Sequence, residues 1–329
     1  MSPYRNQVAA ALAAVTIDGP SRYAWLGRRS RPLPASTDAA LDESERRNYL
    51  LFCLREELYA SFYCHGRPVP ARWGAPGPVA ADPRLVEAMA RANPGRGSWE
   101  PGWTVDRLDG RDAIVAHRRL RTRVRLDDCR SESAEVALGA EVSIRLPKEL
   151  QEQSPGFYTV VADVADTEPS ADFVRVYWNV GRSGAPPLVS ALAARLNGER
   201  VPFRLKVASH PFHLDRCDAS VLYLRADIFR QMTGALREIA ARLITYLRPQ
   251  IPAFTLELAP GVGLAEDVGS GSFGQRRCGL LAEAIVLADE QRIARPGERL
   301  DAVAAHFAEA GVAIDAPYLE PSLAGRHVL

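Results

Sequence analysis

The sequence lacks any uninterrupted apolar run of about 18 residues, the length at which a membrane-spanning helix becomes a candidate. Its first residues, MSPYRNQVAAALAAV, contain a short apolar patch but neither the long hydrophobic region nor the cleavage site of a secretory signal. We therefore expect no membrane span and no secretory segment.

Cysteine is scarce, and the cysteines present are scattered. The chain of 329 residues has five, none in a CxxC spacing: Cys53, Cys64, Cys129, Cys217 and Cys278. An odd number of dispersed cysteines argues against a disulfide framework and favours a reducing compartment. We therefore expect a cytoplasmic protein.

An excess of one charge is absent as well. Lysine and arginine number 41, and aspartate and glutamate number 40. Such a balance produces no overall field of the kind that attracts nucleic acids or anionic membranes. We expect neither among the partners of this protein.

A metal site is not indicated either. His210, His213, Asp215 and Cys217 fall within SHPFHLDRC, but their spacing matches no usual zinc site. A polar loop between two strands is the simpler interpretation. We expect no metal and no other cofactor.

Kinase motifs are also missing, although GVGLAEDVGSGSFG at 261–274 resembles a glycine-rich nucleotide loop. No VAIK strand follows it, and no HRD or DFG sequence occurs. The segment leads into a helix beginning near Gln275, with Arg276 and Arg277 in its first turn. Backbone N–H groups at a helix start attract anions, so this is either an anion site or an ordinary loop.

Helical patterns dominate the first part of the chain, and strands with interspersed helices follow. The clearest early helices are at 41–66 and 82–93, and Asp109-Gly110 marks a hairpin turn. The pattern predicts an α+β fold with a central, mostly antiparallel sheet, flanking helices and a helical N-terminal third. We expect a helical region at 1–98 and an α+β domain at 99–329, unless the two form one continuous domain.

Two apolar strands carry basic residues on one face. In NGERVPFRLKV (197–207), Val201, Phe203, Leu205 and Val207 share one parity, whereas Arg204 and Lys206 share the other. In DFVRVYWNV (172–180), Arg175 and Tyr177 likewise alternate with apolar residues, and a helix at 186–196 connects the two strands. Either this face is open to water or it holds a lysine close to other cations.

The full set of candidate residues on these strands and their neighbours contains one lysine, several guanidiniums and two phenols: Arg175, Tyr177, Arg204, Lys206, Arg216, Tyr223 and Arg277. Guanidiniums bind phosphate in a bidentate manner. A lysine among arginines has a lowered pKa and can act as a base near neutral pH. The set therefore suits β-elimination of phosphate from phosphoserine or phosphothreonine, and equally suits passive phosphate binding.

A basic run, HRRLRTRVR at 117–125, places Arg119, Arg121, Arg123 and Arg125 on one face of a strand. A solvated sheet edge with protective charge is one interpretation. Contact with an acidic peptide or a partner protein is the other.

Several of these segments resemble the HopA-type effector family, and in particular its actinobacterial branch, the lyase partners in class V lanthipeptide and thioviridamide-like biosynthesis. The resemblance covers about residues 45 to 290 and rests on these sequences: PGFYTVVAD, VRVYWNV, LNGERVPFRLKV, RCDASVLYL and LAPGVGLAEDVGSGSFGQRRCGLLAEAI. The chain is more distantly similar to phosphothreonine lyases.

The resemblance implies roles for the candidate residues. Lys206 would match the general base, and Tyr177 would stand in place of a histidine acid. Tyr223 resembles a contact to a backbone carbonyl of the substrate, and Arg204 would join the substrate-binding residues. The phosphate-binding residues would be Arg175, Arg216 and Arg277.

The resemblance also implies an activity and a partner. The expected enzyme is a carbon–oxygen lyase that eliminates phosphate from a phosphorylated precursor peptide, giving dehydroalanine or dehydrobutyrine. A separate Ser/Thr kinase would install the phosphate and form a complex with the lyase. The alternative is a non-catalytic phosphopeptide- or kinase-binding protein. Lys206 separates the two, because only a lyase needs an amine that can lose its proton.

Overall fold

The structure is a computed structural model that describes residues 2–70, 80–131, 135–151, 154–165, 172–267 and 271–323. The helices within these ranges are α1 (Pro3–Ala14), α2 (Ala35–Ala40), α3 (Glu43–Ser61), α4 (Pro83–Ala92), α5 (Ala185–Gly198), α6 (Ala226–Arg242), α7 (Phe273–Glu290) and α8 (Pro296–Glu309). None of these helices is long and apolar enough to cross a membrane.

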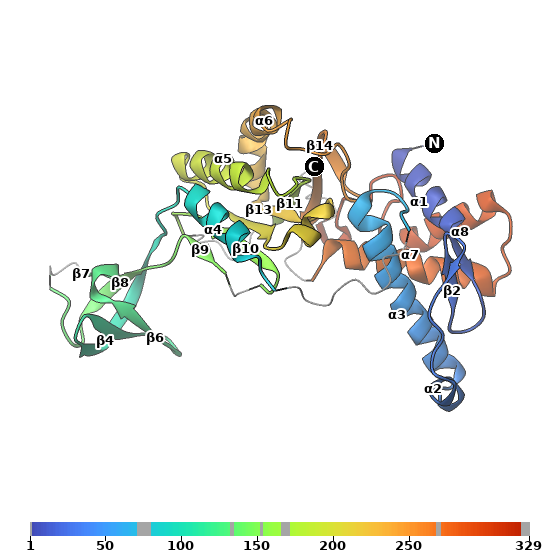
Figure 1. Cartoon of the computed structure of the whole chain (residues 1–329), viewed down its shortest axis with the longest axis horizontal. Helices are drawn as coiled ribbons and strands as arrows, with labels where there is room; N and C mark the ends of the chain where they lie inside the picture. Colours follow the sequence, from blue (N-terminus) through green and yellow to red (C-terminus); the bar gives the residue numbers. More distant parts are fainter. Residues whose placement is uncertain are drawn as a thin grey trace.

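A seven-stranded sheet forms the centre of the molecule (Figure 1). In sequence order its strands are β9 (Glu149–Leu150), β10 (Phe157–Val161), β11 (Phe173–Trp178), β12 (Arg204–Ala208), β13 (Ser220–Arg225), β14 (Leu256–Ala259) and β15 (Val262–Asp267). Their spatial order is β14-β15-β11-β13-β12-β10-β9, and each neighbouring pair is antiparallel. The predicted α+β fold with a central antiparallel sheet and N-terminal helices is confirmed.

The two faces of the central sheet are covered differently. Val174, Val176, Leu205 and Val207 are buried in a cluster with α4, α5 and α6. The opposite face carries the alternate residues of these strands. Part of this face packs against α1, α3, α7 and α8 through residues such as Tyr177. The predicted apolar face is therefore confirmed, whereas the other face carries cations together with side chains of a second hydrophobic cluster, such as Tyr177 and Val221.

The N-terminal third is helical but not wholly so. Asp42 and Glu45 form a capping box at the start of α3, which explains why the helix begins where the sequence predicts it. A small sheet of β1 (Val15–Ile17), β2 (Tyr23–Trp25) and β3 (Arg28–Arg29) was not expected. Because α1 and α3 share one hydrophobic cluster with α7 and α8, the ends of the chain are packed together. The boundary at residue 98 stays a prediction.

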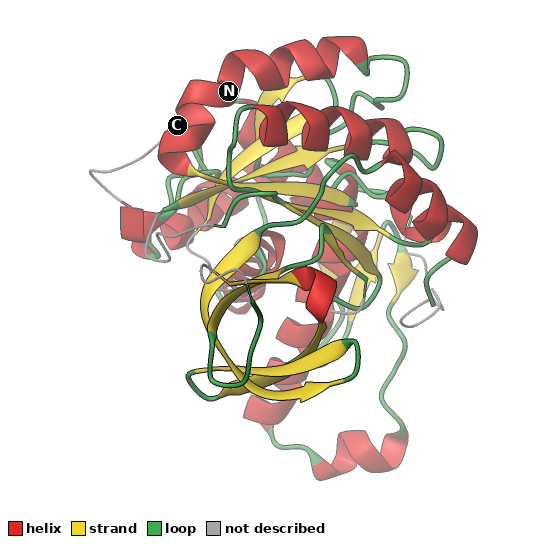
Figure 2. Ribbon diagram, turned by 90° about the vertical axis from the view of Figure 1, so that its left-hand side faces the viewer, coloured by secondary structure: helices red, strands yellow, loops and turns green. Residues whose placement is uncertain are grey.

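A second sheet lies to one side of the central sheet (Figure 1). Its strands are β4 (Trp99–Asp109), β5 (Asp112–His117), β6 (Leu120–Arg125), β7 (Cys129–Ser131) and β8 (Glu141–Arg145), in the spatial order β6-β5-β4-β8-β7. Gly110 has φ of 62° in the turn between β4 and β5, as the Asp-Gly signal predicted. Figure 2 shows these strands curled round upon themselves. They have a small hydrophobic core of their own, which includes Trp103, Val115 and Ile144.

Candidate active site

Two rows of opposed residues cross the central sheet. In the first row, Arg175 on β11 is opposite Tyr223 on β13, which is opposite Arg204 on β12. In the second row, Tyr177 is opposite Val221, which is opposite Lys206. Directly opposed residues project from the same face, so both rows lie on the face away from α5 and α6.

The structure brings four of the predicted residues into one pocket of about 570 Å³: Arg175, Arg204, Lys206 and Tyr223. Apolar side chains of Phe173, Phe203 and Leu146 form part of the lining, and Ser98 and Glu100 come from the start of the second sheet. A lysine, two guanidiniums and a phenol therefore share one partly apolar cavity.

Lys206 is the amine in this pocket. Its Nζ lies 5.8 Å from the ring centre of Tyr223 and is half-buried. Within the described ranges, no carboxylate forms an ion pair with it. Burial lowers the pKa of Lys206, and the neighbouring charges of Arg204 and Arg175 lower it further. The amine is thereby held closer to its neutral form.

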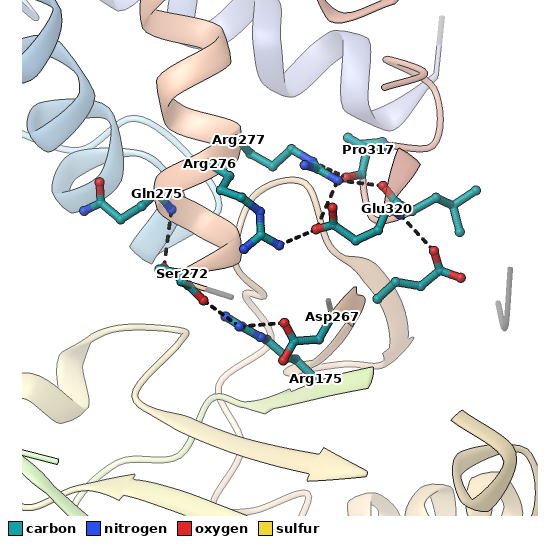
Figure 3. A network of polar contacts seen from close by, with 11 residues as sticks. Arg175, Asp267, Ser272, Gln275, Arg276, Arg277, Pro317 and Glu320 are labelled. Carbon is teal, nitrogen blue, oxygen red and sulfur yellow. Dashed lines mark hydrogen bonds and ion pairs between the residues drawn. The ribbon is translucent and has the colours of Figure 1, made fainter. Parts of the chain in front are cut away.

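Arg175 is a buried cation with an internal partner. Its Nη2 donates to Oδ1 of Asp267 and to the carbonyl oxygen of Gly271, both at 2.7 Å (Figure 3). Its guanidinium carbon lies 5.5 Å from the ring centre of Tyr223, and its buried Nε has no partner in the described part of the chain. Two acceptors thus hold Arg175 at the pocket, and its Nε donor is left unused by the described residues.

Asp267 is a residue of the site that the sequence interpretation missed. It is almost fully buried, lines the pocket, and pairs with Arg175 across 92 positions of sequence. The signal available in the sequence was a pair of acids, Glu266 and Asp267, within the glycine-rich segment at 261–274.

Tyr177 is buried and is absent from the residues that line the pocket. Its phenol is hydrogen-bonded to that of Tyr63, and burial is the main cause of its raised pKa. Tyr63 in turn stacks on Tyr59 at 5.3 Å, and the Tyr59 hydroxyl donates to Asp218. Tyr177 therefore lies at one end of a row of contacting tyrosine side chains.

Arg216 lies at the other end of this row of side chains, next to Tyr59. Its Nε and Nη2 donate to the two carboxylate oxygens of Asp218 at 2.8 and 2.7 Å, and Nη2 also donates to Tyr59. Arg216 lines a separate cavity of about 190 Å³ that shares no residue with the Lys206 pocket. The structure does not bring Arg216 together with Lys206.

Arg277 is directed toward residues 317–320, here called the C-terminal segment. Its Nε donates to the carbonyl oxygen of Pro317 at 2.7 Å, and its Nη2 donates to that of Leu319 at 2.6 Å (Figure 3). Nη2 also lies 3.5 Å from Glu320, and burial lowers the pKa of Arg277. The structure does not place Arg277 among the residues that line the Lys206 pocket.

The predicted anion site before α7 is only partly described. Residues 262–267 form strand β15, and residues 268–270 lie outside the described ranges. Ser272 caps α7 by accepting a hydrogen bond from the backbone N–H of Gln275 at 3.4 Å. Anion binding at this helix start stays a prediction.

Comparison with known proteins identifies a family match and, among the solved structures that match, two effector proteins. The sequence profile of the HopA1 effector protein family matches residues 149–319, which include every strand of the central sheet. An effector protein from Pseudomonas syringae pv. tomato strain DC3000 is 19% identical with a TM-score of 0.40, and the alignment covers 50% of this chain and 62% of that one.

A second effector protein, from Pseudomonas syringae pv. syringae strain 61, is 18% identical, also with a TM-score of 0.40 and the same coverage of 50% and 62%. The chain thus matches less than two thirds of the length of either effector. A search of curated proteins finds no match.

Proposed function

This chain belongs to the HopA1 effector protein family, and from that premise we propose that it is a phosphoserine/phosphothreonine lyase. It eliminates phosphate from a kinase-phosphorylated precursor peptide and forms dehydroalanine or dehydrobutyrine in lanthipeptide-type biosynthesis. One observation carries the proposal: the Lys206 amine, with a lowered pKa, sits beside Arg204 and Arg175 in one pocket. A protein that only binds phosphate needs the arginines but has no use for a neutral amine.

The proposed reaction begins at the neutral amine of Lys206. The amine takes the Cα proton of the phosphorylated residue, and the electron pair of that C–H bond forms the Cα=Cβ double bond. The Cβ–O bond breaks, and phosphate leaves with its electrons. A phosphate monoester carries about −1.5 to −2 charge, which the guanidiniums of Arg204 and Arg175 offset. Lys206 ends the step as an ammonium.

Tyr223 is better suited than Tyr177 to contact the leaving phosphate. Both phenols have raised pKa values through burial and stay protonated near neutral pH. Only Tyr223 lines the pocket, where its ring lies near both Lys206 and Arg175. We assign Tyr223 as a hydrogen-bond donor to the leaving phosphate and Tyr177 as a residue that positions the sheet.

Arg216 and Arg277 have structural roles in this proposal. The donors of Arg216 are used by Asp218 and Tyr59, and those of Arg277 by the C-terminal segment. Each therefore holds an element next to the pocket without contacting the phosphate.

A separate Ser/Thr kinase supplies the phosphorylated peptide, since the chain has no kinase motif set. Holding kinase and lyase in one complex raises the effective concentration of the intermediate. We place the reaction in a cytoplasm, which agrees with the five free thiols of the chain.

The test is direct elimination by the purified protein. A synthetic phosphoserine peptide is incubated with it, released inorganic phosphate is measured, and mass spectrometry follows the loss of phosphoric acid from the peptide. Stoichiometric phosphate release with dehydroalanine formation is expected. Hydrolysis to serine would contradict the lyase mechanism, and tight binding of the phosphopeptide without turnover would favour the non-catalytic alternative.

A further inference from the structure

A groove adjoins the proposed active site. Its cavity volume is about 1060 Å³, and it runs along the open side of the curled second sheet, between β6 and the residues that follow β8. Glu100 and Leu146 line both this groove and the Lys206 pocket. The two cavities therefore meet, and one extended chain can occupy both.

The lining of the groove is mostly basic. Six basic side chains line it, namely Arg96, Arg121, Arg123, Arg125, Arg145 and Lys148, against two acidic ones, Glu100 and Asp128. This local excess contrasts with the near-neutral charge of the whole chain. A negatively charged segment is the occupant that complements it.

Not every one of these charges is available to a ligand. Arg121 pairs with Asp106, and Arg123 pairs with Asp109, on the exposed side of the strands. Exposed pairs of this kind contribute little to stability, so a ligand carboxylate can compete for them. Arg96 and Arg125 are exposed and form no ion pair with a described residue.

Strand β6 offers a free backbone edge beside the groove. It is an outer strand of its sheet, and within the described ranges its backbone bonds only to β5. Leu120 is 65% exposed, and Thr122 and Val124 line the groove on the same parity. An added strand gains main-chain hydrogen bonds here together with apolar contacts for alternate side chains.

The arginines of β6 also decide which strand is accepted. An edge with a row of cations repels a second copy of itself, which is how sheet proteins avoid edge-to-edge aggregation. The same row attracts a strand rich in carboxylates. Charge therefore admits an acidic peptide and excludes the identical edge of a neighbouring molecule.

We propose that this groove binds an acidic, extended segment of the peptide substrate as an added strand on β6, while the phosphorylated residue enters the Lys206 pocket. The proposal rests on the proposed function for the identity of the substrate. Glu100 lies at the junction of the two cavities and repels carboxylates close to the phosphoresidue. The acidic segment must therefore be separated from that residue by neutral positions.

The first test compares synthetic phosphoserine peptides that carry a glutamate tract or a matched glutamine tract, separated from the phosphoserine by a neutral linker. We expect the glutamate peptide to have a KM about tenfold lower, with kcat unchanged, because the tract contributes uniform binding. The double variant Arg96→Glu/Arg125→Glu should remove this difference. Arg107→Glu is the matched control, since Arg107 is exposed on β4 and does not line the groove.

A second measurement examines strand addition itself. Methylation of alternate backbone nitrogens in the glutamate tract removes hydrogen-bond donors without changing charge. It should weaken binding of the unphosphorylated glutamate peptide, measured by fluorescence anisotropy, about tenfold or more. Arginine-dependent binding that ignores N-methylation would overturn the strand-addition geometry.

The outcomes separate the two proposals. If both peptides are turned over with equal KM and the double variant changes nothing, the groove proposal is wrong and the lyase proposal stands. If no phosphopeptide is turned over but the glutamate peptide binds in an arginine-dependent manner, the lyase proposal fails and the acidic-peptide groove is supported. Absence of binding by any glutamate peptide overturns the groove in either case.

Discussion

At the scale of single residues, the amine of Lys206 is the group on which the proposed chemistry depends. Replacing Lys206 by Ala should lower elimination about 10²- to 10⁴-fold, the usual effect of losing a general base. Lys206→Arg keeps the charge but stays protonated, because guanidinium does not titrate in proteins, and should be as inactive as Lys206→Ala. Phosphopeptide binding, followed by calorimetry, should persist in both variants. Near-normal turnover in Lys206→Arg would remove Lys206 from the mechanism.

The lowered pKa of Lys206 leads to a prediction about pH. The base is active when deprotonated, so kcat/KM should rise with pH through the pKa of Lys206. The positive charge of Arg204 disfavours the ammonium form of Lys206. Removing the Arg204 charge therefore stabilises that ammonium form. Arg204→Gln should therefore raise the pKa of Lys206 and move the rising limb to higher pH. Arg107→Gln, outside the pocket, should leave the profile unmoved, and a shift to lower pH in Arg204→Gln would contradict the assignment.

The candidate residues show which part of a site a local pattern predicts. Lys206 and Arg204 were placed on one face because strand alternation depends only on neighbouring residues. Asp267 was missed because its pairing with Arg175 arises from the contact of β11 with β15, which local periodicity does not encode.

At the scale of elements, the start of α7 is tightly packed on the buried tyrosines. A Cβ added at Gly274 would lie 2.3 Å from Cε1 of Tyr63, whereas one added at Gly279 meets nothing nearer than Cδ of Arg55 at 3.8 Å. Gly274→Ala should destabilise the protein by about 1–3 kcal/mol through overpacking. Gly279→Ala, in the same helix, should stabilise it by about 0.5–1 kcal/mol.

Urea unfolding of both variants measures these two effects. The comparison is matched, because each change adds one methyl group to α7 and only the surroundings differ. If Gly274→Ala were as stable as Gly279→Ala, the close contact between α7 and Tyr63 would be incorrect.

The ends of helices and the shortest strands were predicted less well than the long elements. The sequence placed a helix at 186–196, and α5 runs slightly further, from Ala185 to Gly198. The positive φ, however, falls on Arg200, at 56°, rather than on the glycine. The small sheet β1–β3 was missed because its strands are only two or three residues long, too short for a period to be recognised.

At the scale of the whole molecule, the C-terminal segment ties distant elements together. Glu320 is 4% exposed and pairs with Arg276 on α7, and its backbone N–H donates to Glu266 on β15. Glu320→Ala leaves the buried charge of Arg277 without its nearest carboxylate. The change should destabilise the fold by about 3–5 kcal/mol, the usual cost of breaking a buried ion pair from one side.

The control for this prediction is an ion pair on the surface. Glu298 pairs with Arg295 at 3.2 Å, and both side chains are mostly exposed. Glu298→Ala should therefore cost less than about 1 kcal/mol. Thermal unfolding of the two variants provides the comparison, and equal losses would show that the C-terminal segment does not hold α7.

The sequence by itself determined the elements and their chemical character: the α+β class, the capped helix α3, and strands with one apolar and one cationic face. These features follow from interactions between residues close together along the chain. Only the tertiary structure decided which cations meet. Arg175, Arg204 and Lys206 share a pocket because β13 lies between β11 and β12. The donors of Arg216 and Arg277 are instead taken up by Asp218 and by residues 317–320. The physical reason is that a buried guanidinium must donate its hydrogen bonds to whichever acceptors the fold places beside it. The order of the strands and the path of the C-terminal residues determine which acceptors those are.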